Sequence, residues 1–351
     1  MKKLFESYKN YFRFGAAISG FLLLTEEERK KFNLPAFDLP EKALAASQFN
    51  LVVAENECKM ESVYVAENSF DFSGPDRLLN FAKQNNQQMR WHTLVWHNQT
   101  PEWIFKDEKG QRVSKEVLEE RLKNYIFVVG ERYKNDICSV DVVNECISDK
   151  NFVLRNGEDR SLWFDILGEE YIDKAFFWAK QAFPKSSLVI NDYNLEMVEG
   201  KRLGMYELLK GMKARGVPVD TVGLQMHINI ENPPVSEIEK TIELYGSLGL
   251  NVIVTEMEIS VYTDKEQGNN KFDALREFTP ELFEQQAKRY FEIFECFKRQ
   301  AKKGILKDVV LWGISDRLSW KNYFPVEGRN DAPLLFDREG KPKPAFERLT
   351  K

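Results

Sequence analysis

Metal-binding side chains are scarce in this chain. Its 351 residues include only 3 histidines and 4 cysteines. No CxxC pair occurs, and the histidines do not follow an HxH, HxxH or HExxH spacing, so the common metal-ligand patterns are missing. We therefore expect neither a metal nor a cofactor, and we interpret the cysteines as reduced, mostly buried thiols. They are Cys58, Cys138, Cys146 and Cys296.

The chain also lacks an excess of either charge. Lys+Arg 50 and Asp+Glu 55 are intermixed and give a formal charge of −5. This balance provides neither a basic face for nucleic acid nor a polybasic anchor for a membrane. We expect a neutral or small-molecule partner.

Long apolar runs are missing as well. The run GFLLL at 20–24 is too short to span a bilayer. The N-terminal segment begins with basic residues, as a signal peptide does, but Glu6, Lys9 and Asn10 interrupt the stretch that would have to be apolar. The expectation is a cytoplasmic protein, or a secreted one if the sequence has lost its leader, and a monomer or homodimer.

Short apolar runs, in contrast, recur along the whole chain. They are continuous rather than alternating, which is typical of strands covered on both faces in a parallel sheet. Amphipathic helical patterns separate many of them. The expected strands are 13–18, 50–55, 88–96, 140–145, 187–192, 221–227, 251–259 and 308–315.

The helical patterns complete a repeated strand–helix alternation. Helices are expected at 114–134 with Ser114 as N-cap, at 161–183, at 200–215 and at 281–303. Eight such repeats predict an α/β protein, a (β/α)8 TIM barrel, with residues 1–351 forming a single domain. Two polar stretches, 25–41 and 260–279, are expected to be loops at the strand-end rim.

Two of the strands end in glutamates. SVDVVNE closes on Glu145, and NVIVTEMEI carries Glu256. The active site of a barrel is built from the C-terminal ends of its strands, which would bring the two carboxylates together. Paired carboxylates are what cleavage of a glycosidic bond requires.

Other polar and aromatic side chains fall at the same strand ends, and they include all three histidines. We interpret this pattern as a polar site ringed by aromatic rings. These residues are Glu55, Asn56, Lys59, His92, Trp96, His97, Gln99, Asn144, Asn191, Asp192, Tyr193, Gln225, His227, Glu258, Trp312 and Trp320.

These strand ends carry a resemblance to a known family. The strings FGAAI, AENECK, HTLVWHNQTPEW, VDVVNE, NDYN, GLQMHIN, VTEMEI, LWGISDRLSW and PLLFDREGKPKPAF occur in this order from about residue 12 to the C-terminus. As a set they resemble glycoside hydrolase family 10, the endo-β-1,4-xylanases. The resemblance implies hydrolysis of β-1,4-xylosidic bonds in xylan or xylo-oligosaccharides by a retaining mechanism.

The resemblance also implies roles for individual residues. Glu145 would be the general acid/base and Glu256 the nucleophile, with Asn144 on the sugar 2-hydroxyl and His227 holding Glu256. Tyr193 is a further substrate-binding candidate that would help to hold Glu256, and His97 and Glu258 would lie behind the site. The remaining sugar-binding candidates are Glu55, Asn56, Lys59, His92, Trp96, Gln99, Gln225, Trp312 and Trp320.

Three positions depart from the family pattern. Glu258 stands where the family usually has Asp, and we expect it to loosen the hydrogen bond to His227. Met60 replaces a common Trp and is expected to alter the wall of the cleft. Trp91 replaces a common Gly and is expected to add bulk behind the site.

Other functions stay open at this point. A related retaining glycosidase could act on β-glucans or aryl xylosides, and a sugar-binding protein or sensor could use the same barrel without catalysis. A metal-dependent hydrolase is disfavoured by the histidine spacing. If the chain is cytoplasmic, its substrate would be imported xylo-oligosaccharide rather than polymer.

Overall fold

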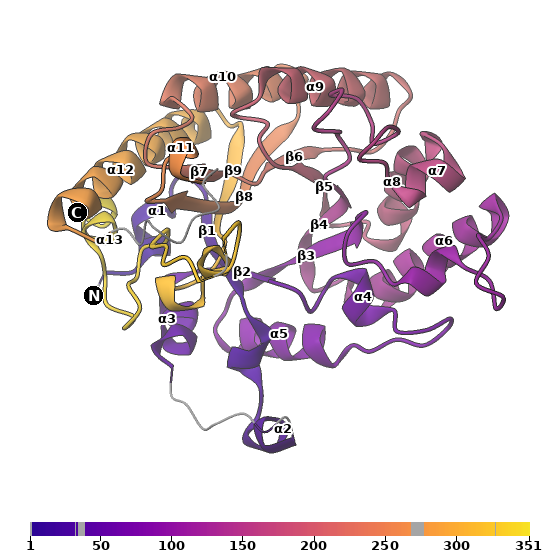
Figure 1. Ribbon diagram of the computed structural model, residues 1–351, viewed down its shortest axis with the longest axis horizontal. Helices are drawn as coiled ribbons and strands as arrows, with labels where there is room; N and C mark the ends of the chain where they lie inside the picture. The colour runs from indigo at the N-terminus through magenta and orange to yellow at the C-terminus, as the bar shows by residue number, and fades with distance from the viewer. Residues whose placement is uncertain (1, 32, 34–38, 268–276, 327) are drawn as a thin grey trace.

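A closed barrel of parallel strands forms the centre of the molecule (Figure 1). The computed structural model describes residues 2–31, 33, 39–267, 277–326 and 328–351. The strand order in this part of the chain is β6-β5-β4-β3-β2-β1-β9-β8-β7, and pairing of β6 with β8 closes the barrel. The predicted (β/α)8 TIM barrel is thereby confirmed. The strands are β1 Arg13–Ile18, β2 Leu51–Ala54, β3 Gln88–Val95, β4 Ile137–Asn144, β5 Ser187–Asp192, β6 Thr221–Leu224, β7 His227–Asn229, β8 Asn251–Ser260 and β9 Leu306–Leu311.

The sixth predicted strand, 221–227, is wrong as a single element. The structure divides it into β6 and β7, which pair with different parts of β8. Met226 lies at the break with φ of 61°, a left-handed conformation that a continuous strand cannot contain. The break separates Gln225 from His227, and these two side chains contact different carboxylates in the cleft.

Helices surround the barrel in Figure 1. The predictions at 114–134, 200–215 and 281–303 correspond to α6, α9 and α12, and Ser114 caps α6 by accepting a hydrogen bond from the Val117 amide. The described helices are α1 Leu4–Tyr8, α2 Glu26–Lys31, α3 Pro40–Gln48, α4 Met60–Val63, α5 Ser73–Gln84, α6 Lys115–Tyr133, α7 Leu162–Leu167, α8 Glu170–Ala182, α9 Glu199–Ala214, α10 Val235–Gly246, α11 Asp264–Gln267, α12 Pro280–Lys302 and α13 Pro344–Leu349.

Three helix and loop predictions need correction. The segment 161–183 is two helices, α7 and α8, because Gly168 between them adopts φ of 73°. The stretches 25–41 and 260–279 are not loops throughout, since α2 and α11 lie within them. Residues 34–38 and 268–276 of these stretches lie outside the described residues.

The interior of the barrel contains an apolar cluster and a buried ion pair. An apolar cluster of Ala17, Leu51, Val53, Val310 and Trp312 occupies part of it. In another part the buried Arg90 donates to Asp141 at 2.5 Å, and the other oxygen of Asp141 lies 2.8 Å from Nδ1 of His92. A buried charge is tolerated when it is paired in this way, and the pairing fixes the His92 ring. The larger apolar core packs the outer strand faces against the helices.

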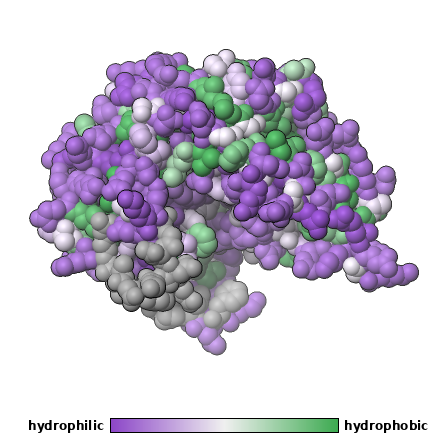
Figure 2. Space-filling view, turned by 45° about the horizontal axis from the view of Figure 1, so that its top comes forward, coloured by the Kyte–Doolittle hydropathy of each residue, from purple (hydrophilic) through white to green (hydrophobic). Residues whose placement is uncertain are grey.

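The two ends of the chain meet on one side of the barrel (Figure 1). The hydroxyl group of Tyr8 in α1 donates to the carbonyl oxygen of Leu349 in α13 at 3.1 Å. Hydrophilic side chains cover most of the face seen in Figure 2, with apolar ones in small groups between them. No helix in the described ranges has both the length and the apolarity needed to cross a membrane. The four cysteines are unpaired, and three of them are buried.

Candidate active site

A cleft of about 710 Å³ opens at the C-terminal ends of the strands. Both predicted catalytic glutamates line it, together with eleven of the twelve predicted sugar-binding residues. The twelfth, Asn144, is buried. Tyr193 lines the cleft with its hydroxyl group turned away from Glu256. The lining residues are Glu55, Asn56, Lys59, His92, Trp96, Asn98, Gln99, Glu145, Tyr193, Asn194, Gln225, His227, Glu256, Trp312, Leu318, Trp320, Lys321 and Phe324.

Glu256 lies within β8 and is held as an ionised carboxylate. Its oxygens accept a hydrogen bond from Nδ2 of Asn191 at 2.9 Å and lie 3.2 Å from Nε2 of His227. Burial alone would raise the pKa of this carboxyl group. The hydrogen bond and charge of His227, the charge of His92 and the amide of Asn191 outweigh burial and lower the pKa of Glu256 to about 2.

His227 connects Glu256 to a second carboxylate. Its Nδ1 lies 2.7 Å from Oε1 of Glu258, an oxygen that also accepts from Nε1 of Trp320 at 2.7 Å. Burial opposes protonation of the ring, but the hydrogen bonds and charges of Glu256 and Glu258 raise the pKa of His227 to about 9. The expectation that Glu258 loosens this contact is wrong, because the longer side chain reaches the ring at full hydrogen-bond strength.

Glu145 follows β4 directly and has the opposite electrostatic environment. Its carboxyl oxygens accept from Nε1 of Trp96 at 2.8 Å and from Nε2 of Gln225 at 3.0 Å. Burial is the largest influence and raises the pKa of Glu145, with the charges of Asp192 and Glu256 adding to it. These effects outweigh the two hydrogen bonds, so Glu145 keeps its proton to higher pH than an exposed glutamate does.

The backbone of Glu145 is strained. Its φ of 55° is left-handed, which costs a non-glycine residue about 1–3 kcal/mol and persists only where surrounding contacts enforce it. The amide of Glu145 donates to the carbonyl oxygen of Asn191 at 2.8 Å, and its carbonyl oxygen accepts from Nε of Arg155 at 2.7 Å. Both ends of the residue are therefore fixed by hydrogen bonds.

A chain of amides joins the two carboxyl groups. Gln225 donates to Glu145 and, at 3.4 Å, to Oδ1 of Asn144; Nδ2 of Asn191 donates to that same oxygen at 2.9 Å and also to Glu256. Two carboxyl groups with pKa values pushed apart at one site are the arrangement of an acid and a nucleophile. The site can therefore protonate one atom of a ligand while attacking another.

Polar side chains that follow the ends of β2 and β3 line part of the cleft. Nζ of Lys59 donates to Oδ1 of Asn56 at 2.9 Å and to Oε1 of Gln99 at 2.6 Å, and it lies 5.1 Å from the Trp96 ring centre. Burial lowers the pKa of Lys59, against the opposing charges of Glu256, Glu55 and Glu145. Burial and the charges of Glu57 and Glu258 raise the pKa of Glu55 to about 7.

Aromatic rings form another wall. Trp312 lies edge-on to His92 at 5.4 Å, and Trp320 lies edge-on to His227 at 5.3 Å. Phe324, which the sequence did not indicate, stacks on Trp320 with 5.1 Å between ring centres and 14° between planes. Flat apolar faces next to hydrogen-bonding groups are typical of sites for small organic ligands.

The hydroxyl group of Tyr193 lies elsewhere than expected. Tyr193 does not hold Glu256; its hydroxyl group bonds Asp149 and Arg155, and Asn191 supplies the contact to Glu256 instead. His97 lies behind Glu145 in a small gap shared with Arg155, and burial, with the charges of Arg155 and Lys201, lowers its pKa to about 4.

Met60 and Trp91, the other two positions that differ from the family pattern, lie away from the cleft. Met60 is buried and is not among the residues that line the cleft, so it does not alter that wall. Trp91 is buried on the outer face of β3 against Tyr133, with 5.1 Å between ring centres. Among the described residues, no three His, Cys, Asp or Glu side chains converge as metal ligands.

Comparison with known proteins identifies similar chains. Residues 3–351 match the sequence profile of glycosyl hydrolase family 10. Endo-1,4-beta-xylanase A from Caldicellulosiruptor saccharolyticus is 40% identical over 349 residues, covering 99% of this chain and 94% of that protein. A mutant structure in complex with xylotriose is 39% identical, with a TM-score of 0.88 and 100% of both chains covered. TsXylA, an intracellular xylanase from Thermoanaerobacterium saccharolyticum, is 36% identical, with a TM-score of 0.84 and coverage of 99% and 98%.

Proposed function

The chain belongs to glycosyl hydrolase family 10, and on this premise we propose that it is a retaining endo-1,4-β-xylanase acting on xylan or xylo-oligosaccharides. The observation that carries the proposal is the pair Glu145 and Glu256. They line one cleft, they are joined through Gln225, Asn144 and Asn191, and their pKa values are shifted in opposite directions.

In the first step, the glycosidic bond breaks. Glu145 gives its proton to the leaving oxygen, while the Glu256 carboxylate forms an ester bond to the anomeric carbon. The raised pKa of Glu145 and the lowered pKa of Glu256 shift each group toward the protonation state that this step needs.

In the second step, water releases the sugar. Esterification removes the charge of Glu256, which has helped to keep the Glu145 proton in place. Glu145 has given up that proton and now accepts one from the attacking water, whose oxygen displaces Glu256 from the anomeric carbon. Two displacements restore the original configuration.

The sugar-binding proposal rests on groups that are free or exposed in the cleft. Nδ2 of Asn144 is buried and has no hydrogen-bond partner in the described structure, whereas its Oδ1 is held by two amides. This donor is available for the 2-hydroxyl group of a sugar, a contact that strengthens in the transition state. Trp312 and Trp320 offer ring faces to the C–H surface of a pyranose.

Two measurements test this function. Glu145→Ala and Glu256→Ala should each abolish most xylan cleavage, and near wild-type activity of either variant contradicts the assigned roles. Proton NMR of the first product should show the β-anomer; early appearance of the α-anomer contradicts retention. Parallel assays on cellulose and aryl β-glucosides distinguish a xylanase from a β-glucanase.

We also propose a cytoplasmic location, supported by similarity to an intracellular xylanase. An enzyme in the cytoplasm meets imported xylo-oligosaccharides. Rates on short xylo-oligosaccharides should therefore exceed rates on insoluble xylan, and fractionation of cells that express the natural gene should recover the protein in the cytoplasm. Recovery from the medium contradicts this proposal and leaves the activity untouched.

A further inference from the structure

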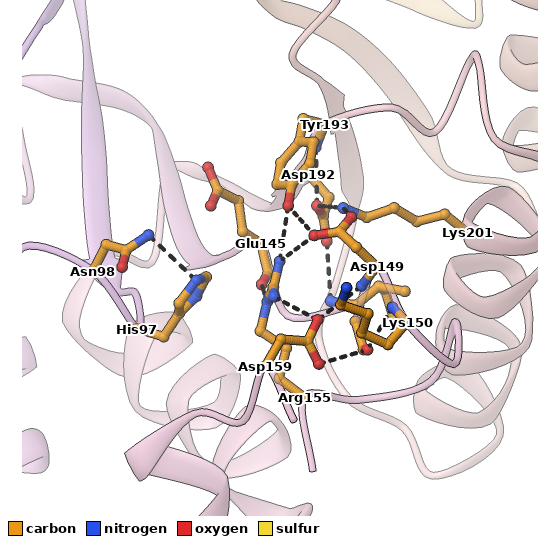
Figure 3. Close-up of polar contacts among 12 residues, drawn as sticks. His97, Asn98, Glu145, Asp149, Lys150, Arg155, Asp159, Asp192, Tyr193 and Lys201 are labelled. Carbon is orange, nitrogen blue, oxygen red and sulfur yellow. Dashed lines mark hydrogen bonds and ion pairs between the residues drawn. The ribbon is translucent and has the colours of Figure 1, made fainter. Parts of the chain in front are cut away.

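A network of opposite charges lies directly behind Glu145 (Figure 3). Its centre is Arg155, which is 5% exposed and comes from the connection between β4 and α7. Nη1 of Arg155 donates to Asp159 at 3.0 Å, and Nη2 donates to Asp149 at 3.2 Å and to the Tyr193 hydroxyl group at 3.1 Å. The remaining donor, Nε, bonds the carbonyl oxygen of Glu145 at 2.7 Å.

Every partner of Arg155 is itself held in place. Oδ1 of Asp159 accepts from the Ser148 hydroxyl group at 2.8 Å, and its Oδ2 accepts from the Asp149 amide at 2.9 Å. Lys201, fully buried, binds Asp149 at 2.8 Å and Asp192 at 3.0 Å. The guanidinium group is therefore bound by two carboxylates, those of Asp149 and Asp159, which are themselves held by hydrogen bonds. These contacts fix the direction of its Nε–H bond.

The same network fixes the two residues that follow Glu145. The amide of Arg155 donates to the carbonyl oxygen of Cys146 at 3.1 Å, and the amide of Ile147 donates to Oδ2 of Asp192 at 3.1 Å. Consecutive backbone groups of residues 145–147 are thus bound from behind. Figure 3 shows the Glu145 side chain extending away from Arg155, so the guanidinium group acts on the backbone and not on the carboxyl group.

We propose that Arg155 is a positioning residue for proton transfer by Glu145. It fixes the left-handed backbone of Glu145 and through it the direction of the carboxyl group toward the leaving oxygen. The inference rests on the proposed acid/base role of Glu145. It assigns a function to a network that does not contact the reacting atoms.

The leaving group provides the test, because only a poor leaving group needs the proton. Phenyl and 2,4-dinitrophenyl β-xylobiosides carry the same sugar unit, so changes in sugar binding affect both. Dinitrophenolate departs without a proton, whereas the phenyl substrate depends on Glu145. A variant with a misdirected Glu145 should lose kcat/KM selectively on the phenyl substrate.

Arg155→Lys is the first variant, because it keeps a cation among the carboxylates but loses the fork geometry that reaches the Glu145 carbonyl oxygen. We expect its kcat/KM to fall about 10-fold or more on the phenyl substrate and less than about 3-fold on the dinitrophenyl substrate. Asp159→Asn, which loosens Arg155 without approaching the cleft, should show the same selectivity to a smaller degree. Circular dichroism and thermal melting establish that each variant is folded.

Arg160→Gln is the matched control. Arg160 lies in the same connection, is 65% exposed and pairs with Asp165 at 3.4 Å, so this variant should keep both activities. Equal losses on both substrates in Arg155→Lys and Asp159→Asn, or no loss on either, overturn the inference. Glu145→Ala separates the two proposals. If this variant loses kcat/KM equally on both substrates, the acid/base role of Glu145 itself fails. If it loses kcat/KM selectively on the phenyl substrate and the Arg155 and Asp159 variants do not, only the role of Arg155 is rejected.

Discussion

Nε2 of His227 lies 3.2 Å from Oε2 of Glu256 inside the cleft. The other nitrogen of the ring is held by Glu258 at 2.7 Å. A charged imidazole fixed between two carboxylates keeps Glu256 ionised down to low pH. The pKa of Glu256, the proposed nucleophile, therefore depends on Glu258, which contacts it only through His227.

Glu258→Gln tests this dependence. Loss of the second negative charge lowers the pKa of His227 and weakens its support of Glu256, so the pKa of Glu256 should rise. Because activity is lost as pH falls through the pKa of Glu256, the acid limb of kcat/KM should move to higher pH by about 0.5–1 unit. The exposed Glu102, changed to Gln, should leave the profile in place, and an unmoved acid limb in Glu258→Gln contradicts the proposed coupling.

Gln225→Met should affect the opposite limb. Gln225 donates to Glu145 and so lowers its pKa, in opposition to burial. Without this donor the pKa of Glu145 rises, and the proton needed for the first step is retained to higher pH. The basic limb of kcat/KM should shift upward by about 0.5–1 unit; a downward shift would show that Gln225 does not stabilise the ionised form.

Asn191→Ala should lower activity more than stability. It removes the hydrogen bonds to Glu256 and to Asn144, and a hydrogen bond to a charged group contributes about 1.5–3 kcal/mol. We expect kcat/KM on xylo-oligosaccharides to fall about 10- to 100-fold, with a raised acid limb. Thr255→Val, which removes only the hydroxyl group that binds Asn191 at 2.7 Å, should have an intermediate effect. Wild-type kinetics in Asn191→Ala refute the assigned support of Glu256.

Glu196→Gln should stabilise the protein at alkaline pH. Glu196 is fully buried, and neither carboxyl oxygen has a hydrogen-bond partner in the described structure. Burial raises its pKa from 4.5 to about 7, so the folded state binds the proton more tightly than the unfolded state. The cost of ionisation is absent below about pH 4.5, grows as pH rises and is complete above about pH 7, where it amounts to about 3 kcal/mol.

Denaturant unfolding at pH 4.5 and pH 8 measures this difference. The free energy of unfolding of Glu196→Gln relative to wild type should increase by about that amount between the two pH values. Substitution of the exposed Glu102 should show no such change. If the difference in free energy of unfolding between Glu196→Gln and wild type is the same at both pH values, ionisation of Glu196 does not destabilise the folded state, and the prediction is wrong.

The sequence predicted the barrel because each strand is an apolar run with its own signal. β1 and β5 have the predicted bounds, whereas β4 ends at Asn144, one residue before the predicted end at Glu145. The break at Met226 had no such signal, because methionine rarely adopts a left-handed backbone and only the surrounding fold enforces it. The break at Gly168 was recognisable, since glycine is the usual residue at positive φ.

The site was predicted to the extent that strand geometry determines it. Side chains alternate along a strand, so the inward direction of Asn191 could have been inferred from its place in β5. Besides His227, Tyr193 was expected from the sequence to support Glu256. Tyr193 lies beyond the end of β5, where alternation no longer fixes the direction of a side chain. Arg155 lies in an irregular connection, and its contact with Glu145 depends on tertiary folding that periodicity does not encode.

The hydrogen bond between Tyr8 and Leu349 joins the N-terminal helix of the chain to its C-terminal helix. Chain ends usually fray independently of each other, but here each end is anchored by the other. Release of α13 would remove this contact from α1, which precedes β1 in the chain. New ends introduced elsewhere, with the old ones joined by a short linker, would leave the barrel with the same closed circuit of strands.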